Sequence, residues 1–149
     1  MLILRIIIAL FIFSNLSYAD DALVNEKKAK AAIKELAISL KKSLKTALQE
    51  SGPIVAVEYC NIAALDITDG ISLNKGVILK RTSLKVRNNI NIASSWEINI
   101  LNQFEKRKVL GESIGSIDYQ EVYFDSNNKP FFRYMKAIPT GEVCLTCHG

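Results

Sequence analysis

The sequence is poor in several residue types that point to common protein classes. Its 149 residues include three cysteines, three prolines, one tryptophan and one histidine. No apolar run after residue 19 is long enough to cross a membrane. We find no internal repeat and no low-complexity stretch, and the length indicates one domain.

The excess of positive over negative charge is also small. Nineteen Lys and Arg residues face 15 Asp and Glu residues, which gives a formal net charge of +4. So small an excess, with no accompanying pattern of basic and aromatic residues, gives no support for nucleic-acid binding. Nothing in the sequence indicates a kinase or cyclase output domain.

Residues 1–19 have the layout of a secretory signal peptide. Arg5 is the basic start, an apolar run extends from Ile6 to Phe13, and small residues up to Ala19 precede the expected cleavage position. An uncleaved N-terminal anchor is the alternative, although the apolar run is short for a permanent span. We therefore expect a periplasmic protein whose mature domain is residues 20–149.

Hydrophobic periodicity and turn residues predict helices followed by short strands. In the first half we expect a helix over Asp21–Gln49, a break at Gly52-Pro53, a buried helix over Ile54–Leu65, and turns at Asp69-Gly70 and Asn74–Gly76. A strand over Val77–Thr82 and a loop over Arg87–Ala93 should follow. In the last part we expect a helix from a Ser94–Glu97 capping box to Leu110-Gly111, and strands over Ile117–Phe124 and Phe131–Ile138. This order favours an α+β domain with an antiparallel sheet that is short of strands.

The last six residues, Cys144-Leu145-Thr146-Cys147-His148-Gly149, contain the C-x-x-C-H pattern of covalent c-type haem attachment. Two thiols about one helical turn apart can add to the two vinyl groups of one porphyrin. The next residue, His148, is then placed to ligate the iron. Covalent attachment also suits an exported chain, since free haem would be diluted away. The motif predicts one haem c.

The same residues could form two other kinds of site. Cys144 and Cys147 could form a disulfide or a redox-active dithiol, but no helix follows them to lower a thiol pKa. Cys60, Cys144, Cys147 and His148 could instead form a Cys₃His zinc site. Exported proteins seldom keep thiolates for structural zinc, so haem is the preferred interpretation.

The second axial position of the iron is less well defined. His148 is the only histidine, so ligation by two histidines is excluded. The candidates are Cys60, Met135, a lysine, a tyrosine or an open position. A strand methionine such as Met135 is more often core filler than ligand. Cys60 is the thiol left over from an odd count, and its alternative is an inert buried cysteine.

Three segments resemble the PAS-like c-type haem-binding domain family, which occurs in exported proteins and sensor regions. They are Val57–Ala63, Leu79–Glu105 and Arg133–Gly149, and the resemblance covers roughly residues 25–149. It implies a PAS-like antiparallel sheet and axial ligation by His and Cys. On this basis Cys144 and Cys147 would be the thioether sites, His148 the proximal ligand and Cys60 the distal thiolate.

The matching stretch also contains Arg81 and Arg87, together with Asn88 and Asn91. Arginine suits the carboxylates of haem propionates, although both arginines could instead brace the loop before Ser94.

The sequence departs from the family in two places. Asn89 and Ala93 stand where the family usually has prolines. Relatives also continue past the haem motif, so we expect a truncated sequence that lacks C-terminal strands.

These observations predict a periplasmic monohaem cytochrome-like protein that acts in redox or gas sensing or in electron transfer. Its partner would be a redox protein or a diatomic ligand, with no nucleic acid and no membrane span after signal cleavage. Two strong axial ligands would leave no open coordination position, so we do not expect an enzyme. A thiolate opposite histidine stabilises ferric iron, which predicts a low reduction potential.

Overall fold

The structure is a computed structural model that describes residues 2–86, 88–139 and 141–142, with side chains from residue 21 onward except those of residues 22 and 60. Its elements are α1 (Leu2–Lys75), η1 (Asn89–Asn91), α2 (Ser95–Val109), η2 (Ile114–Ser116), β1 (Asp118–Phe124) and β2 (Pro130–Lys136). The predicted α+β class, with N-terminal helices before a short antiparallel sheet, is confirmed.

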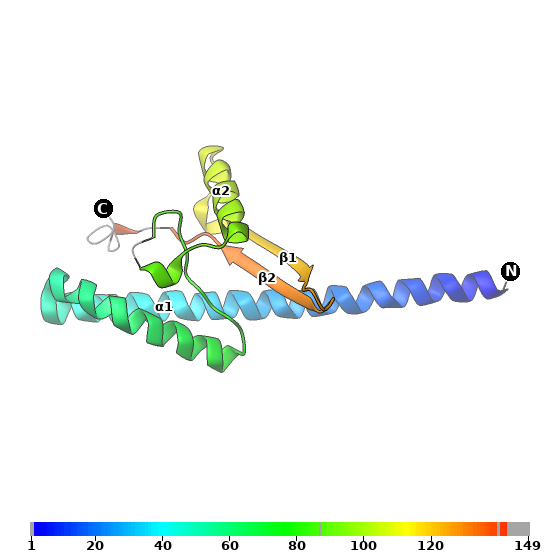
Figure 1. Cartoon of the computed structure of the whole chain (residues 1–149), viewed down its shortest axis with the longest axis horizontal. Helices are drawn as coiled ribbons and strands as arrows, with labels where there is room; N and C mark the ends of the chain where they lie inside the picture. Colours follow the sequence, from blue (N-terminus) through cyan, green and yellow to red (C-terminus); the bar gives the residue numbers. More distant parts are fainter. Residues whose placement is uncertain (1, 87, 140, 143–149) are drawn as a thin grey trace.

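Helix α1 is a helical hairpin, because its path reverses at Gly52. This residue has φ 72° and ψ 177°, in a region that glycine enters without steric cost. Pro53 follows, and its fixed φ suits the first turn of a new helix. We call residues 2–51 the first arm and residues 53–75 the second arm. Figure 1 shows the green second arm running back along the first.

The two arms share a small apolar core. Ala32 and Leu36 of the first arm and Ile71 of the second are buried, and Leu40, Ile67, Val77 and Leu79 pack against them. Near the same end, Lys75 Nζ lies 2.8 Å from Glu35 Oε2. Apolar contact and an ion pair therefore hold the arms together.

The predicted turn at Asp69-Gly70 is wrong, because the second arm stays helical to Lys75. Ile67 and Ile71 pack on the first arm, and this burial keeps the intervening residues helical. The helix ends where the second turn was predicted, with Gly76 at φ 59°.

The predicted strand over Val77–Thr82 is also wrong. These residues form no strand, and two of their backbone donors bind the end of the helix instead of a neighbouring strand. The Val77 N–H donates to the Ser72 carbonyl at 3.0 Å, and the Leu79 N–H donates to Ser72 Oγ at 3.1 Å.

Helix α2 begins at the predicted capping box. The Ser94 N–H donates to Glu97 Oε2 at 2.6 Å, and the Glu97 N–H donates to Ser94 Oγ at 3.3 Å. The helix ends at Val109, and Gly111 takes a φ of 89° just beyond it. Both predicted ends of the helix are therefore confirmed.

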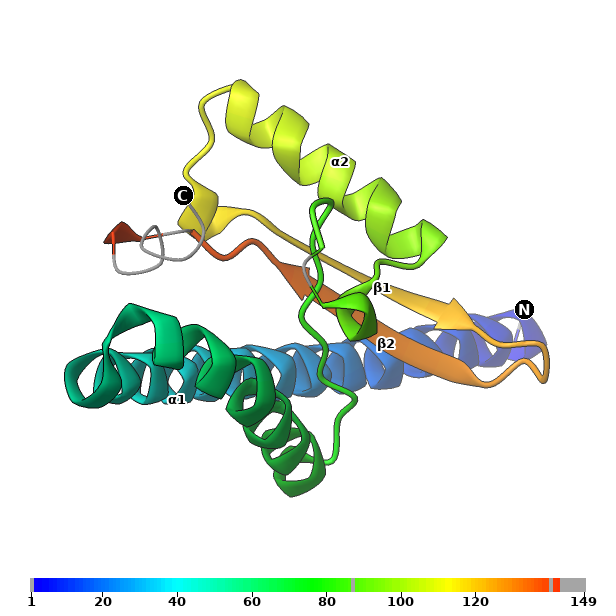
Figure 2. The same cartoon turned by 60° about the vertical axis from the view of Figure 1, so that its left-hand side comes forward.

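Strands β1 and β2 form an antiparallel hairpin in the register Asp118↔Lys136 to Phe124↔Pro130. The two strands were predicted within two residues at each end. One face of the hairpin packs against α2 around a second core of Ile100, Phe104 and Ile117. Figure 2 shows the hairpin between α2 and α1.

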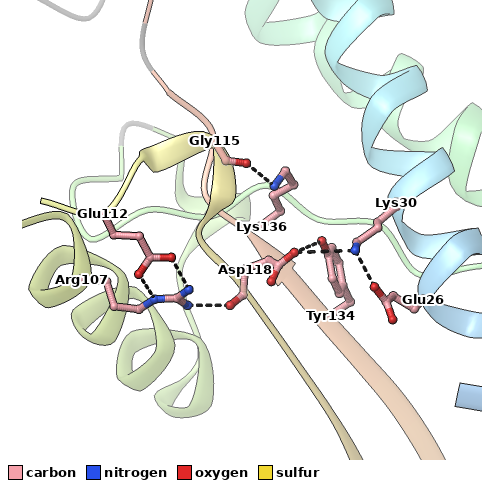
Figure 3. Close-up of polar contacts among 8 residues, drawn as sticks. All are labelled: Glu26, Lys30, Arg107, Glu112, Gly115, Asp118, Tyr134 and Lys136. Atoms are coloured by element: carbon pink, nitrogen blue, oxygen red, sulfur yellow. Dashed lines mark hydrogen bonds and ion pairs between the residues drawn. The ribbon is translucent and has the colours of Figure 1, made fainter. Parts of the chain in front are cut away.

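Polar contacts around Asp118 connect the hairpin with both helices (Figure 3). Asp118 Oδ2 accepts from the Tyr134 hydroxyl at 2.7 Å and lies 3.9 Å from Lys30 Nζ of α1. The Asp118 carbonyl accepts from Arg107 Nη1 of α2 at 2.7 Å. Burial, together with the hydrogen bond to Asp118, raises the pKa of Tyr134. This network fixes the sheet relative to α1 and α2.

Candidate functional site

Most of the predicted haem residues lie outside the described residues. This applies to Cys144, Cys147, His148 and Arg87. Cys60 lies in the second arm of α1, but its side chain is not among those described. The geometry of the site is therefore built from the residues that surround Cys60 along the chain and in space.

The helix around Cys60 buries a narrow face and exposes apolar side chains. Ala56 and Ala64, four residues before and after Cys60, are buried. Val57 is 50% exposed and Ile62 is 64% exposed. The prediction of a buried helix over Ile54–Leu65 is thus wrong for much of its surface, because its small alanines pack inward and its larger apolar residues do not.

The loop at residues 88–92 contacts this part of the helix. Asn88 Nδ2 donates to Asn61 Oδ1 at 3.1 Å. Asn88 Oδ1 also accepts from the Ile90 N–H at 3.0 Å and caps η1. Ile90 and Ile92 of this loop are 66% and 57% exposed. Two segments distant in sequence therefore meet beside Cys60, and each exposes apolar side chains.

Lys80 links the loop to the start of α2. Its Nζ donates to the Ile92 carbonyl at 2.7 Å and to Glu97 Oε2 at 2.8 Å. Burial would raise the pKa of Glu97, but hydrogen bonds from Lys80 and Ser94 outweigh it and lower that pKa. Sequence reasoning missed the role of Lys80, because no local pattern marks a lysine that bridges a loop and a helix cap.

Arg81 and Met135 are the other predicted residues that the structure describes. Arg81 is half-buried and engaged in interactions within the chain. Met135 is partly buried against the core of Ile100, Phe104 and Ile117. This packing is what the interpretation of Met135 as core filler predicts, and whether Met135 also ligates iron stays untested.

Arg133 lies on the same face of the hairpin as Met135. Its guanidinium carbon is 3.5 Å from the Tyr123 ring centroid and 4.3 Å from the Trp96 ring centroid. Its Nη2 lies 2.8 Å from Glu121 Oε1. Arg133 thus braces the hairpin against α2, a role that its sequence position did not reveal.

An open hollow of about 390 Å³ lies beside the hairpin bend of α1. The residues that line it are Ser39, Lys42, Ser43, Thr46, Ala47, Glu50, Ser51, Val55 and Tyr59, and most of the surface that they expose there is apolar. Tyr59 is the neighbour of Cys60 in the sequence, so this hollow lies close to the helical turn that carries Cys60.

Among the described side chains, no group of three or more His, Cys, Asp or Glu residues is arranged to hold a metal ion. Within the same part of the chain, no helix combines the length and apolar character needed to cross a bilayer.

Comparison with known proteins identifies the family. No curated protein and no solved structure matches the sequence significantly. The profile of the Tll0287-like family matches residues 17–149, which include the second arm with Cys60, the 88–92 loop and the C-terminal motif. The chain belongs to the Tll0287-like family, a family of PAS-like haem-binding domains.

Proposed function

We propose that this chain is an exported protein with one covalently attached haem c, acting in redox or gas sensing or in electron transfer. The observation that carries the proposal is a C-x-x-C-H motif at Cys144–His148 in a member of a haem-binding family. The signal-like residues 1–19 support export, since c-type haem is attached outside the cytoplasm.

In this proposal each part of the site has one task. Cys144 and Cys147 would hold the haem through thioether bonds, and His148 and Cys60 would provide the nitrogen and thiolate ligands of its iron. The haem, when bound, supplies a one-electron redox centre. The exposed Val57, about one helical turn before Cys60, would then gain apolar cover that it lacks in the chain alone.

Arg81 and Arg87 are assigned to the haem propionates. A propionate is a carboxylate, and an arginine fork matches its two oxygens. Arg81 lies between Lys80, which contacts Glu97, and Thr82, whose hydroxyl donates to the Asn91 carbonyl at 3.0 Å. These flanking contacts hold the backbone of Arg81 beside the 88–92 loop.

Two axial ligands from the protein would leave no open coordination position, so the proposal does not include enzymatic turnover. A thiolate ligand favours ferric iron, and we expect a reduction potential below that of cytochromes with His and Met ligands. Gas sensing requires that Cys60 leave the iron on reduction, whereas electron transfer requires that Cys60 stay bound.

A pyridine haemochrome assay on protein produced with c-type maturation machinery tests the proposal. We expect covalent haem in the parent protein and none after Cys144→Ala with Cys147→Ala. A parent protein without haem would contradict the proposal and favour a zinc or dithiol site, which metal analysis and thiol titration would then separate.

The same material tests the axial ligands. We expect Cys60→Ser to change the ferric spectrum, and Met135→Leu, a matched change in the core, to leave it unchanged. Carbon monoxide added to the reduced parent protein separates the two roles. A bound CO spectrum supports gas sensing, and an unchanged six-coordinate spectrum supports electron transfer.

A further inference from the structure

The hydrogen bond between Asn61 and Asn88 joins the helical turn that carries Cys60 to a loop 27 residues further along the chain. Asn88 uses both ends of its amide group. Its Nδ2 donates to Asn61 Oδ1 at 3.1 Å, while its Oδ1 accepts from the Ile90 N–H at 3.0 Å. One side chain thus caps η1 and attaches η1 to the residue next to Cys60.

From η1, further contacts lead to α2. The Asn91 carbonyl accepts from the Thr82 hydroxyl at 3.0 Å. The Ile92 carbonyl accepts from Lys80 Nζ, which also binds Glu97 of the capping box. Asn61, η1 and the start of α2 are therefore connected by hydrogen bonds of 2.6 to 3.1 Å.

We propose that Asn61 and Asn88 are positioning residues, which hold the Cys60 turn and the 88–92 loop in one arrangement, so that iron ligation by Cys60 and ordering of this loop favour each other. The inference rests on the proposed function, because it takes Cys60 as an iron ligand. Neither asparagine is assigned a contact with the haem.

The physical reason is thermodynamic linkage. A bond from Cys60 to iron restricts the helical turn, and Asn61 shares that turn. When the backbone of Asn61 is restricted, its hydrogen bond with Asn88 is formed for a larger fraction of the time. Asn88 then also caps η1 for a larger fraction of the time. Because coupling between two sites is reciprocal, loosening the loop must weaken ligation by Cys60 to the same degree.

Two variants break this link in different ways. Asn61→Leu removes the acceptor at an exposed helical position where leucine favours the helix. Asn88→Ser keeps a hydroxyl that can cap η1, but its side chain is too short to reach Asn61. Asn61→Asp retains an acceptor for the Asn88 amide. Asn102→Leu, at an exposed position on α2, is the matched control.

The haem-loaded proteins are compared by amide hydrogen exchange and by their ferric spectra. The Asn91 and Ile92 amides bond within η1, at 2.9 and 3.1 Å, and report on loop order. We expect Asn61→Leu and Asn88→Ser to speed their exchange about three- to tenfold, the effect of losing one hydrogen bond. The fraction of iron bound by thiolate should fall in both variants. Asn61→Asp and Asn102→Leu should match the parent.

The outcomes separate this inference from the proposed function. Full haem content with parental exchange and parental spectra in Asn61→Leu and Asn88→Ser would overturn the inference alone. Faster exchange without any loss of thiolate ligation would also overturn it, since the asparagines would then brace the loop without positioning Cys60. A parent protein without covalent haem would contradict the proposed function itself.

Discussion

Two regions of this chain differ in how completely they bury their own apolar residues. The unit of α2 and the β1–β2 hairpin encloses Ile100, Phe104 and Ile117 at 6% exposure or less. The helical turn and loop beside Cys60 leave Ile62 and Ile90 more than 60% exposed. The first region is completed by its own side chains, whereas the described side chains of the second leave apolar surface exposed, part of which we propose that haem covers.

The polar contacts of the two regions differ in the same direction. In the α2–hairpin unit, Arg107 forms a two-point contact with Glu112, at 2.6 and 2.7 Å, and also binds the Asp118 carbonyl. Beside Cys60, the loop meets the helix through the neutral Asn61–Asn88 hydrogen bond. The α2–hairpin unit should therefore be rigid without a cofactor, and the Cys60 region should become rigid when the cofactor binds.

The largest effect is expected in the core of the α2–hairpin unit. Phe104→Ala removes a ring that is 6% exposed, and we expect a loss of about 3–5 kcal/mol in the free energy of unfolding. Val109→Ala, at an 82% exposed position of the same helix, should change the free energy of unfolding by less than about 0.5 kcal/mol, apart from the difference in helix propensity between valine and alanine. Chemical denaturation followed by circular dichroism measures both. Equal effects would contradict the assignment of the core.

A smaller effect is expected at the start of α2. Ser94→Ala removes the hydroxyl that accepts from the Glu97 N–H, and loss of such a cap costs about 1 kcal/mol. Ser95→Ala, one residue into the helix and exposed, is the control and should be close to neutral. If the two variants lost equal stability, the capping box would not be the feature that fixes this end of the helix.

The pH dependence of stability should include a contribution from Glu97. Its pKa is lowered in the folded chain, since hydrogen bonds from Lys80 and Ser94 outweigh burial. The stabilisation is therefore complete above the unfolded pKa of about 4.3 and is lost as the pH falls through the folded pKa. Glu97→Gln should flatten the acid limb of a plot of unfolding free energy against pH. An unchanged acid limb would contradict this role.

The smallest effect on the chain alone is expected beside Cys60. Val57→Ser alters a 50% exposed side chain about one turn before Cys60, and without haem it should change the unfolding free energy by less than about 0.5 kcal/mol. In the haem-loaded protein we expect a clear fall in Tm, because the side chain then has apolar cover to lose. An identical small effect in both forms would remove the contrast between the two regions.

The features predicted correctly from sequence are mostly local. The Ser94–Glu97 capping box and the two hairpin strands depend on neighbouring residues, so their patterns are visible in the sequence. The strand expected at Val77–Thr82 needed a partner strand, and its backbone donors bind Ser72 instead. The turn expected at Asp69-Gly70 was overruled by tertiary packing of Ile67 and Ile71 on the first arm.

The candidate site shows the same division. The haem motif could be recognised from five consecutive residues, and it stays a prediction because it lies outside the described residues. The Asn61–Asn88 contact joins residues far apart in sequence, and neither residue belongs to a spacing pattern that indicates a pair. Contacts of this kind become visible only when the chain is folded.

The intact mass of the purified, matured protein under denaturing conditions tests the central claim most directly. We predict the mass of the mature polypeptide plus one haem, retained after denaturation because both thioether bonds hold it, and the mass of polypeptide alone for Cys144→Ala with Cys147→Ala. A parent protein that shows only polypeptide mass and no colour would contradict the account.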